Sequence, residues 1–113
     1  MAQTYEDKPT LAAWNAVESS IVCGTYTGDG TLNRVISLGF TPRAIFVFCR
    51  GGIPEGGSSY INMGLALPNA PVYSNRDYPA LAVVNGGFQV SYHTGPKAAT
   101  NNQGYFYHYV ALR

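Results

Sequence analysis

One continuous stretch of the sequence decides the fold: Cys23-Gly-Thr-Tyr-Thr-Gly-Asp-Gly-Thr-Leu-Asn-Arg-Val-Ile-Ser-Leu-Gly-Phe-Thr-Pro-Arg-Ala-Ile-Phe-Val-Phe-Cys49. Its first half predicts a strand over residues 21–27, a tight turn at Gly28-Asp-Gly30 and a second strand over residues 34–38. Glycine and aspartate favour the turn because they tolerate backbone conformations that most residues avoid. The stretch therefore begins with two strands joined by a short turn.

The second half of the stretch predicts a corner followed by a further strand. Phe40-Thr-Pro42 forms the corner, because the residue before a proline is restricted to extended conformations. Residues 44–49 are a continuous apolar run. Such a run is typical of a strand that is covered on both faces. We expect this strand to lie in the middle of a sheet.

The clearest hairpin lies further along the chain. It joins residues 80–84 to residues 88–93 through Asn85-Gly-Gly87, and Asn-Gly supplies the positive φ angles that a tight hairpin needs. Period-two alternation divides the second arm into a face with Phe88, Val90 and Tyr92 and a face with Gln89, Ser91 and His93. A last strand over residues 105–112 closes the chain.

The middle of the chain is less regular. Residues 60–67 predict a strand, whereas residues 51–59, 74–77 and 94–104 are polar and rich in glycine, asparagine and serine. So long an irregular region in a small domain is typical of functional or flexible loops.

Residues 1–20 have a different pattern. Leu11, Trp14 and Val17 recur at every third position and form one apolar stripe, which predicts a short helix. A helix this short needs a surface to pack on. That surface is either the domain itself or a sister subunit.

Together these patterns predict an all-β fold. We expect an antiparallel β-sandwich of about six or seven strands over residues 21–113, preceded by a helical or connector segment over residues 1–20. The chain has 113 residues, a net charge of +1 and no run of Lys or Arg, so nucleic acid is not expected as a partner. No apolar run could span a bilayer and the N-terminus lacks the pattern of a signal peptide, so we expect neither membrane insertion nor export.

Three segments resemble a known family. The segments are Gly24-Thr-Tyr-Thr-Gly-Asp-Gly30 with Val35-Ile-Ser-Leu-Gly-Phe-Thr-Pro42 and the apolar strand to Cys49, then Asn85-Gly-Gly-Phe88, and finally Tyr105-Phe-Tyr-His-Tyr-Val-Ala-Leu-Arg113. They resemble a β-sandwich domain of phage and prophage tail-fibre proteins, over about residues 21–49 and 80–113. The order of these features is also distantly similar to H-type lectins. That resemblance implies a homotrimer that binds sugars near its subunit interfaces, and it implies no catalytic residue.

The sequence predicts no enzyme, metal or cofactor. A glycosidase needs two carboxylates at a fixed separation, and only Glu55 and Asp77 lie in the irregular region. The two histidines, His93 and His108, are not accompanied by a Gly-x-Ser-x-Gly motif. Two cysteines and two histidines do not make a convincing structural zinc site.

The two cysteines are interpreted as buried apolar thiols, which is the common role of an unpaired cysteine. A disulfide between Cys23 and Cys49 would require Cα atoms within about 7 Å. The sequence leaves that pairing open.

Binding is better supported than catalysis, because tyrosine offers a large rigid contact surface with a polar tip. Alternation places Tyr105, Tyr107 and Tyr109 on one face of the last strand. This stripe is either half of the sandwich core or a surface for a sister subunit or a sugar. The candidate ligand-binding residues are the stripe and polar residues near the loops: Tyr105, Tyr107, Tyr109, His93, Asn75, Arg76, Asn101 and Asn102.

The functional hypothesis is a non-enzymatic tail-type structural or receptor-binding module. We expect a homo-oligomer, with a trimer favoured, that recognises a cell-surface glycan or protein through many weak sites. It would reside in the virion tail, or in the bacterial cytoplasm before assembly. Two alternatives are a lectin-like carbohydrate-binding protein and a purely structural assembly protein whose aromatic faces hold subunits together.

Overall fold

The computed structural model describes residues 20–50, 60–74 and 78–113. These ranges contain strands and no helix. The strands are β1 (Ile21–Thr27), β2 (Arg34–Ser37), β3 (Ala44–Cys49), β4 (Gly64–Ala66), β5 (Val72–Tyr73), β6 (Pro79–Val84), β7 (Gly87–Val90), β8 (Tyr92–His93), β9 (Ala98–Ala99) and β10 (Phe106–Leu112). The prediction of an all-β antiparallel fold is confirmed. The expected N-terminal helix lies outside the described residues, apart from its last position.

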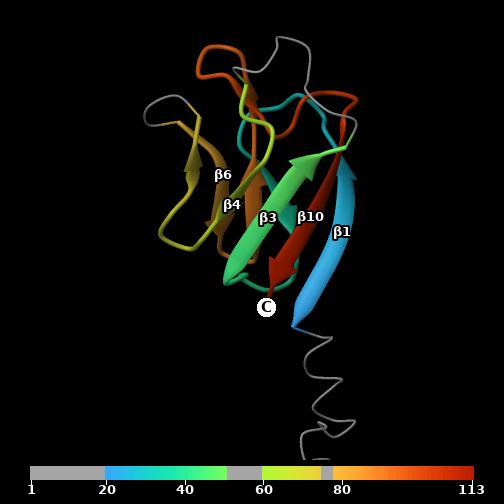
Figure 1. The fold of residues 1–113 in the computed structure, drawn as a ribbon, viewed down its shortest axis with the longest axis vertical. Helices are drawn as coiled ribbons and strands as arrows, with labels where there is room; N and C mark the ends of the chain where they lie inside the picture. The colour runs from blue at the N-terminus through green and yellow to red at the C-terminus, as the bar shows by residue number, and fades with distance from the viewer. Residues whose placement is uncertain (1–19, 51–59, 75–77) are drawn as a thin grey trace, which may run out of the picture.

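Two four-stranded sheets make up most of the domain. The first has the order β1-β10-β3-β4 and the second the order β2-β7-β6-β5, and all pairs within them are antiparallel. Figure 1 shows β3, β10 and β1 side by side on the near side of the molecule, with β6 behind them. A third, two-stranded sheet pairs β8 with β9.

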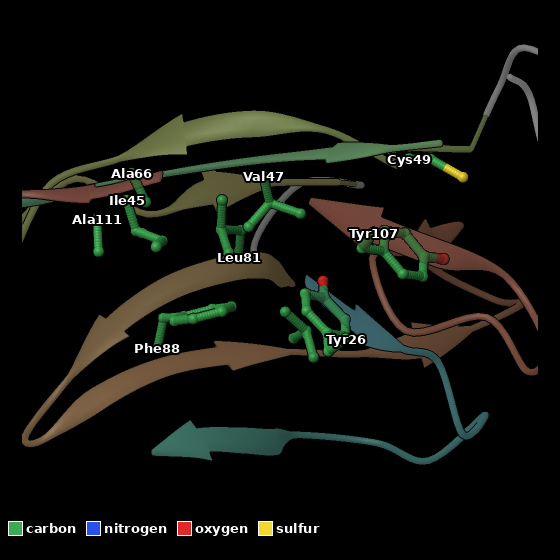
Figure 2. Close-up of a cluster of buried hydrophobic side chains, with 10 residues drawn as sticks. Tyr26, Ile45, Val47, Cys49, Ala66, Leu81, Phe88, Tyr107 and Ala111 are labelled. Carbon is green, nitrogen blue, oxygen red and sulfur yellow. The ribbon is translucent and has the colours of Figure 1, made fainter. Parts of the chain in front are cut away.

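One hydrophobic core is shared by the inner faces of the two large sheets. Ile45 and Val47 of β3 are fully buried, as are Leu81 of β6 and Phe88 of β7. Figure 2 shows Ile45 and Phe88 extending from opposite layers into the same space. Tyr26 joins the layers at the other end of the core, with its ring 5.9 Å from that of Phe88. The two sheets therefore bury their apolar faces against each other.

The structure corrects one expectation about the apolar strand β3. Its inner face is buried through Ile45, Val47 and Cys49, whereas on its outer face Phe46 is 38% exposed and Phe48 is half-buried. Within the described residues, the prediction that both faces would be covered therefore holds for the inner face and only in part for the outer one.

A second correction concerns the hairpin. The predicted alternation holds through Phe88, Gln89 and Val90, but Ser91 is also fully buried instead of pointing outward. Ser91 lies between β7 and β8, where its N–H donates to the Thr100 hydroxyl at 3.0 Å. This hydrogen bond interrupts the alternation, so the faces expected for Tyr92 and His93 do not follow from the earlier residues.

The predicted loop at residues 94–104 contains a buried segment. Ala98, Ala99, Thr100 and Asn101 are all fully buried. Thr100 holds this segment in place, because its hydroxyl donates to the carbonyl of Ala80 and accepts from the N–H of Ser91. The polar composition of residues 94–104 is typical of a surface loop, but the polar groups of this segment form hydrogen bonds inside the fold. This part of the loop closes one end of the core.

The predicted turn at Gly28-Asp-Gly30 is tied to this buried segment. Asp29 Oδ1 accepts hydrogen bonds from the Thr31 N–H at 3.0 Å, the Thr31 hydroxyl at 2.6 Å and Asn101 Nδ2 at 2.7 Å. The backbone N–H groups of Asp29 and Gly30 donate in return to the Asn101 side chain and carbonyl. Asn101 therefore fixes the turn after β1.

Acid is expected to weaken this turn. Hydrogen bonds from Thr31 lower the pKa of Asp29 from 3.8 to about 2. Because the folded pKa lies below the unfolded one, the stabilisation is fully present above about pH 4 and is lost as the pH falls towards about 2. In urea unfolding, the advantage of the wild type over Asp29→Asn should therefore shrink in that interval. An advantage that stays constant across it would contradict this role.

The described ends of the chain lie next to each other. Ile21 pairs with Leu112, and the Arg113 N–H donates to the Ser20 carbonyl at 2.8 Å. The first strand and the last are thus partners along seven residue pairs, from Ile21 to Thr27.

Candidate assembly face

The outer face of the sheet β1-β10-β3-β4 carries apolar side chains in register across all four strands. Cys23 lies opposite Val110, Val110 opposite Phe46, and Phe46 opposite Leu65. These four residues point away from the core, since they alternate with neighbours that are buried or half-buried. They form a continuous row from one edge of the sheet to the other.

Aromatic rings form a second row beside the first. His108 lies opposite Phe48 and Thr25, and the imidazole stacks on the Phe48 ring at 5.1 Å and 12°. The Phe48 ring also lies 5.5 Å from that of Phe46. These contacts join the three rings into one row.

Further apolar residues extend this surface to its margins. They are Ile21, Leu112 and Phe106 at the strand ends. We call the outward residues Ile21, Cys23, Thr25, Phe46, Phe48, Leu65, Phe106, His108, Val110 and Leu112 the apolar face. Leu65 is 59% exposed and Phe106 is 51% exposed, which is unusual for side chains of this kind on one contiguous surface.

The four strands of the apolar face contain no Asp, Glu, Lys or Arg. Charge appears only beyond the strands, where the Arg50 guanidinium lies 5.7 Å from the Phe106 ring centre. The outer face of the second sheet is different, because Val35 and Ala82 flank the polar Gln89 there. Only the first sheet presents an outer face that is apolar from edge to edge.

The size of the apolar face places it among interaction surfaces. β1 and β10 have 7 residues each, β3 has 6 and β4 has 3. At ~3.3 Å per residue and ~4.8 Å between strands, the sheet has an area of roughly 360 Å². Exposed apolar patches of a few hundred Å² or more on a monomer commonly mark a site of interaction.

The two cysteines occupy different environments. Cys23 is exposed on the apolar face, whereas Cys49 is buried on the inner face, and both are free thiols. β10 lies between their strands, so their backbones are separated by about two strand spacings, or ~10 Å. This exceeds the reach of a disulfide. Burial also raises the pKa of the Cys49 thiol.

Two of the predicted ligand-binding residues are buried structural residues. Tyr107 is fully buried and stacks on Tyr26 with ring centres 4.9 Å apart. Its hydroxyl donates to the Ala99 carbonyl at 2.6 Å and accepts from the Asn102 N–H at 2.9 Å, and burial raises its pKa. Asn101 is fully buried in the turn after β1. Neither side chain can reach a ligand from its position in the described structure.

The other two tyrosines of the predicted stripe are partly buried against the same core. Tyr109 lies opposite Gly24 and packs its ring 5.1 Å from that of Phe88. A Cβ at Gly24 would lie 2.7 Å from Tyr109 Cε2, so glycine makes room for this ring. Tyr105 is also half-buried, and its N–H donates to the carbonyl of Asn102. The tyrosine stripe is therefore part of the core, which was one of the two alternatives.

Four predicted residues remain to be considered. Asn102 is half-buried, next to the buried segment. Asn75 and Arg76 lie outside the described residues. His93 is half-buried and lines a shallow surface depression. Among the described candidates, hydrogen bonds connect Asn102 with Tyr105 and Tyr107, but they do so as part of the fold and the buried Tyr107 lines no open site.

Sequence reasoning selected no residue of the apolar face as a site, although one alternative was an assembly protein whose aromatic faces hold subunits together. The signal was present in Phe46 and Phe48 and in Phe106, Val110 and Leu112, with the polar His108 among them. A sequence pattern does not tell which chain covers such residues.

Other kinds of site find no support in the described residues. No group of three or more His, Cys, Asp or Glu side chains in ranges 20–50, 60–74 and 78–113 could hold a metal ion. Over the same ranges, no helix has the length and hydropathy of a membrane-crossing segment. Comparison of the chain with protein-family models, curated proteins and solved structures finds no match. The function has to be inferred from the surfaces of the molecule.

Proposed function

We propose that this chain is a non-enzymatic assembly subunit of the phage- or prophage-tail type. In this proposal it is a β-sandwich that packs on copies of itself through the apolar face, with a trimer as the favoured state. The observation that carries the proposal is the continuous apolar row from Cys23 through Val110 and Phe46 to Leu65. The tail-type assignment rests on the sequence resemblance alone.

The composition of the apolar face supports self-association. Packing on a second copy would remove its exposed aromatic and aliphatic side chains, such as Leu65 and Phe106, from water. A second copy also fits the face electrostatically, because no charged side chain on these strands would be buried without a partner.

The two thiols provide a test of this assembly. Cys23 lies on the apolar face, so packing of copies should shield it from a thiol reagent in the native protein. We expect little rapid labelling of the wild type, one reactive thiol per chain in a monomeric variant, and two after unfolding. A Cys23→Ser variant assigns the reactive site. The rate of labelling measures how accessible the Cys23 thiol is, and light scattering gives the mass of the same sample.

Two results would contradict the assembly. One is a wild-type protein that remains monomeric at micromolar concentration. The other is a Cys23 thiol that reacts equally fast in the wild type and in the variant. Cys49 provides an internal reference, since it is buried in the single chain and should react only on unfolding.

Receptor binding is a second candidate function. A specific observation favours it, which is a depression beside His93 on a part of the surface formed by other strands than the apolar face. Assembly would place several copies of this depression on one particle, and weak sites repeated in this way gain avidity.

A further inference from the structure

The first sheet ends in one strand edge that lacks the usual protection. The outer strands are β1 and β4 in the first sheet and β2 and β5 in the second. β4 and β5 have only three and two residues, β5 pairs with a shifted register, and β2 has four residues and begins with Arg34. Natural proteins protect sheet edges with short strands, charges, prolines or bulges. β1 has seven residues without charge, proline or register shift, and Figure 1 shows it at the outer rim of its sheet.

The hydrogen bonds at the two ends of β1 show which of its backbone groups face the open edge. The Arg113 N–H donates to the Ser20 carbonyl, and the Gly28 N–H donates to the Tyr105 carbonyl, both at 2.8 Å. In an antiparallel pair, residues that bond the neighbouring strand alternate with residues whose backbone groups face away from it. The even-numbered residues of β1 therefore bond β10, and the odd-numbered residues face outward.

The open edge has a defined length. Within the described ranges, the outward N–H and C=O groups of Ile21, Cys23 and Thr25 have no hydrogen-bond partner. The next outward carbonyl, that of Thr27, accepts a hydrogen bond from Arg34 Nη1 at 2.7 Å. Arg34 thus closes the edge at the C-terminal end of β1. The open groups that remain are arranged symmetrically about Cys23.

A second copy of β1, antiparallel to the first, satisfies these groups in one register. Only outward residues can exchange hydrogen bonds across the new pair, so outward residues have to lie opposite each other. With Cys23 opposite Cys23, Ile21 of each copy lies opposite Thr25 of the other, and every open group is paired. A shift by two residues in one direction places Ile21 opposite Thr27, whose carbonyl Arg34 already occupies. A shift in the other direction moves Thr25 beyond the end of the second β1.

The side chains favour the same register. The apolar row from Cys23 to Leu65 would continue in line into the row of the second copy, because Cys23 is its first member and lies at the sheet edge. On the inner side, Val22 of one copy would lie opposite Gly24 of the other. The Tyr109 ring fills the space where a side chain of Gly24 would be, so Val22 would face this half-buried ring.

We propose that the β1 edge pairs with the β1 edge of a second copy about a twofold axis at Cys23, which joins two four-stranded sheets into one. This contact runs along the rim of the sheet and is distinct from packing through the apolar face. It is also weaker, because a single pair of short strands is marginally stable in water. It rests on the proposed assembly in one respect. Free chains would pair only transiently, whereas assembled particles that carry several such edges would hold together through repeated contacts.

Disulfide trapping tests the register in the full-length protein. In a hydrogen-bonded antiparallel pair the Cα atoms lie about 5.5 Å apart, which a disulfide can bridge. Copper phenanthroline in air should therefore join Cys23 of one copy to Cys23 of another, whereas the buried Cys49 should remain a thiol. Every protein in the experiment also carries Phe46→Glu, so that contacts through the apolar face do not bring the thiols together. Non-reducing gel electrophoresis measures how fast the covalent dimer forms at high protein concentration.

Two further cysteine positions provide matched controls. In a Cys23→Ser background, Ile21→Cys alone and Thr25→Cys alone place a thiol on the same edge, but neither position lies opposite itself in the proposed register. We expect Cys23 to be trapped about tenfold or more faster than either of them. A mixture of the two variants should form the heterodimer as fast as Cys23 forms its homodimer.

Thr25→Pro tests the backbone hydrogen bonds. The Thr25 N–H faces the open edge, so proline removes no hydrogen bond of the single chain and the domain should stay folded by circular dichroism. The incoming strand would lose a donor, and by symmetry it would lose it twice, so trapping of Cys23 should slow about tenfold. Thr25→Val keeps the N–H and the branched side chain, and it should be trapped as fast as the parent protein.

Three results would overturn the proposal. The first is the absence of a Cys23 dimer, and the second is equal trapping at positions 21, 23 and 25. The third is a folded Thr25→Pro protein that is trapped as fast as Thr25→Val. Because Phe46→Glu is present throughout, none of these results depends on the apolar face. The assembly is instead judged from the mass of the wild type, so failure of one contact is distinguishable from failure of the other.

Discussion

Phe46→Glu is expected to convert the assembled protein to monomers of 12.2 kDa. Phe46 lies in the middle of the apolar row, between Val110 and Leu65. A carboxylate buried at this position in a subunit interface would lack a partner, which costs several kcal/mol for each subunit. Because Phe46 is 38% exposed in the single chain, the fold itself should be little affected. Light scattering after size-exclusion chromatography measures the change in mass.

Gln89→Glu is the matched control. It places the same charge on the outer face of the second sheet, where Gln89 lies between Val35 and Ala82. We expect its mass to equal that of the wild type. If Phe46→Glu retains the wild-type mass while circular dichroism shows a folded protein, the apolar face is not the assembly surface.

Tyr107→Ala is expected to destabilise the fold more than any substitution at the surface. Loss of a fully buried aromatic side chain costs about 3–5 kcal/mol. The substitution also leaves the Ala99 carbonyl and the Asn102 N–H without their partner, at about 1–3 kcal/mol more. Domains of this size are stable by only about 5–15 kcal/mol, so the variant should lose a large share of its unfolding free energy.

Two companion variants resolve the contributions of the ring and the hydroxyl. Tyr107→Phe keeps the stacking on Tyr26 and should lose only the hydroxyl contribution of about 1–3 kcal/mol. Tyr73→Ala, at a tyrosine that is 53% exposed, should change the unfolding free energy by less than about 0.5 kcal/mol. Urea unfolding measures all three. A Tyr107→Ala protein that is as stable as the wild type would contradict the core role of Tyr107 and would again make it a candidate ligand-binding residue.

The strands were predictable where the hydrophobic pattern and the flanking turn residues indicated the same limits. β1 and β3 begin and end at the residues expected, Ile21–Thr27 and Ala44–Cys49, because turn residues flank both. β6, β7 and β10 deviate by only a few residues. Local propensity and alternation determine such segments without reference to the rest of the fold.

The elements that sequence reasoning missed depend on contacts between distant residues. β5 and β9 contain two residues each, which is too short for any alternation to appear. The burial of Thr100 follows from hydrogen bonds to Ala80 and Ser91, at sequence separations of 20 and 9. A polar side chain satisfied in this way looks the same in a sequence as one that faces water.

The candidate sites could be predicted only in part, for a related reason. A side chain such as Phe46 has the same apolar signature whether its own chain or a second copy covers it. Of the residues around the depression, only His93 was selected from the sequence. Leu32 of the lining and Tyr78, whose ring packs against the His93 imidazole, join it through the fold, from positions 61 and 15 residues earlier in the chain.

The pairing of the first strand with the last has a mechanical consequence. Ser20 and Arg113 are hydrogen-bonded neighbours, and β1 and β10 run antiparallel from that point. A pulling force applied between these two residues would open the ladder like a zipper, one residue pair at a time from Ile21 and Leu112 onward. If β1 and β10 were instead pulled from opposite ends of the ladder, all seven residue pairs would have to break by shear at once. The domain should therefore yield at low force when it is held by its two ends, and a single-molecule pulling experiment would measure that weakness.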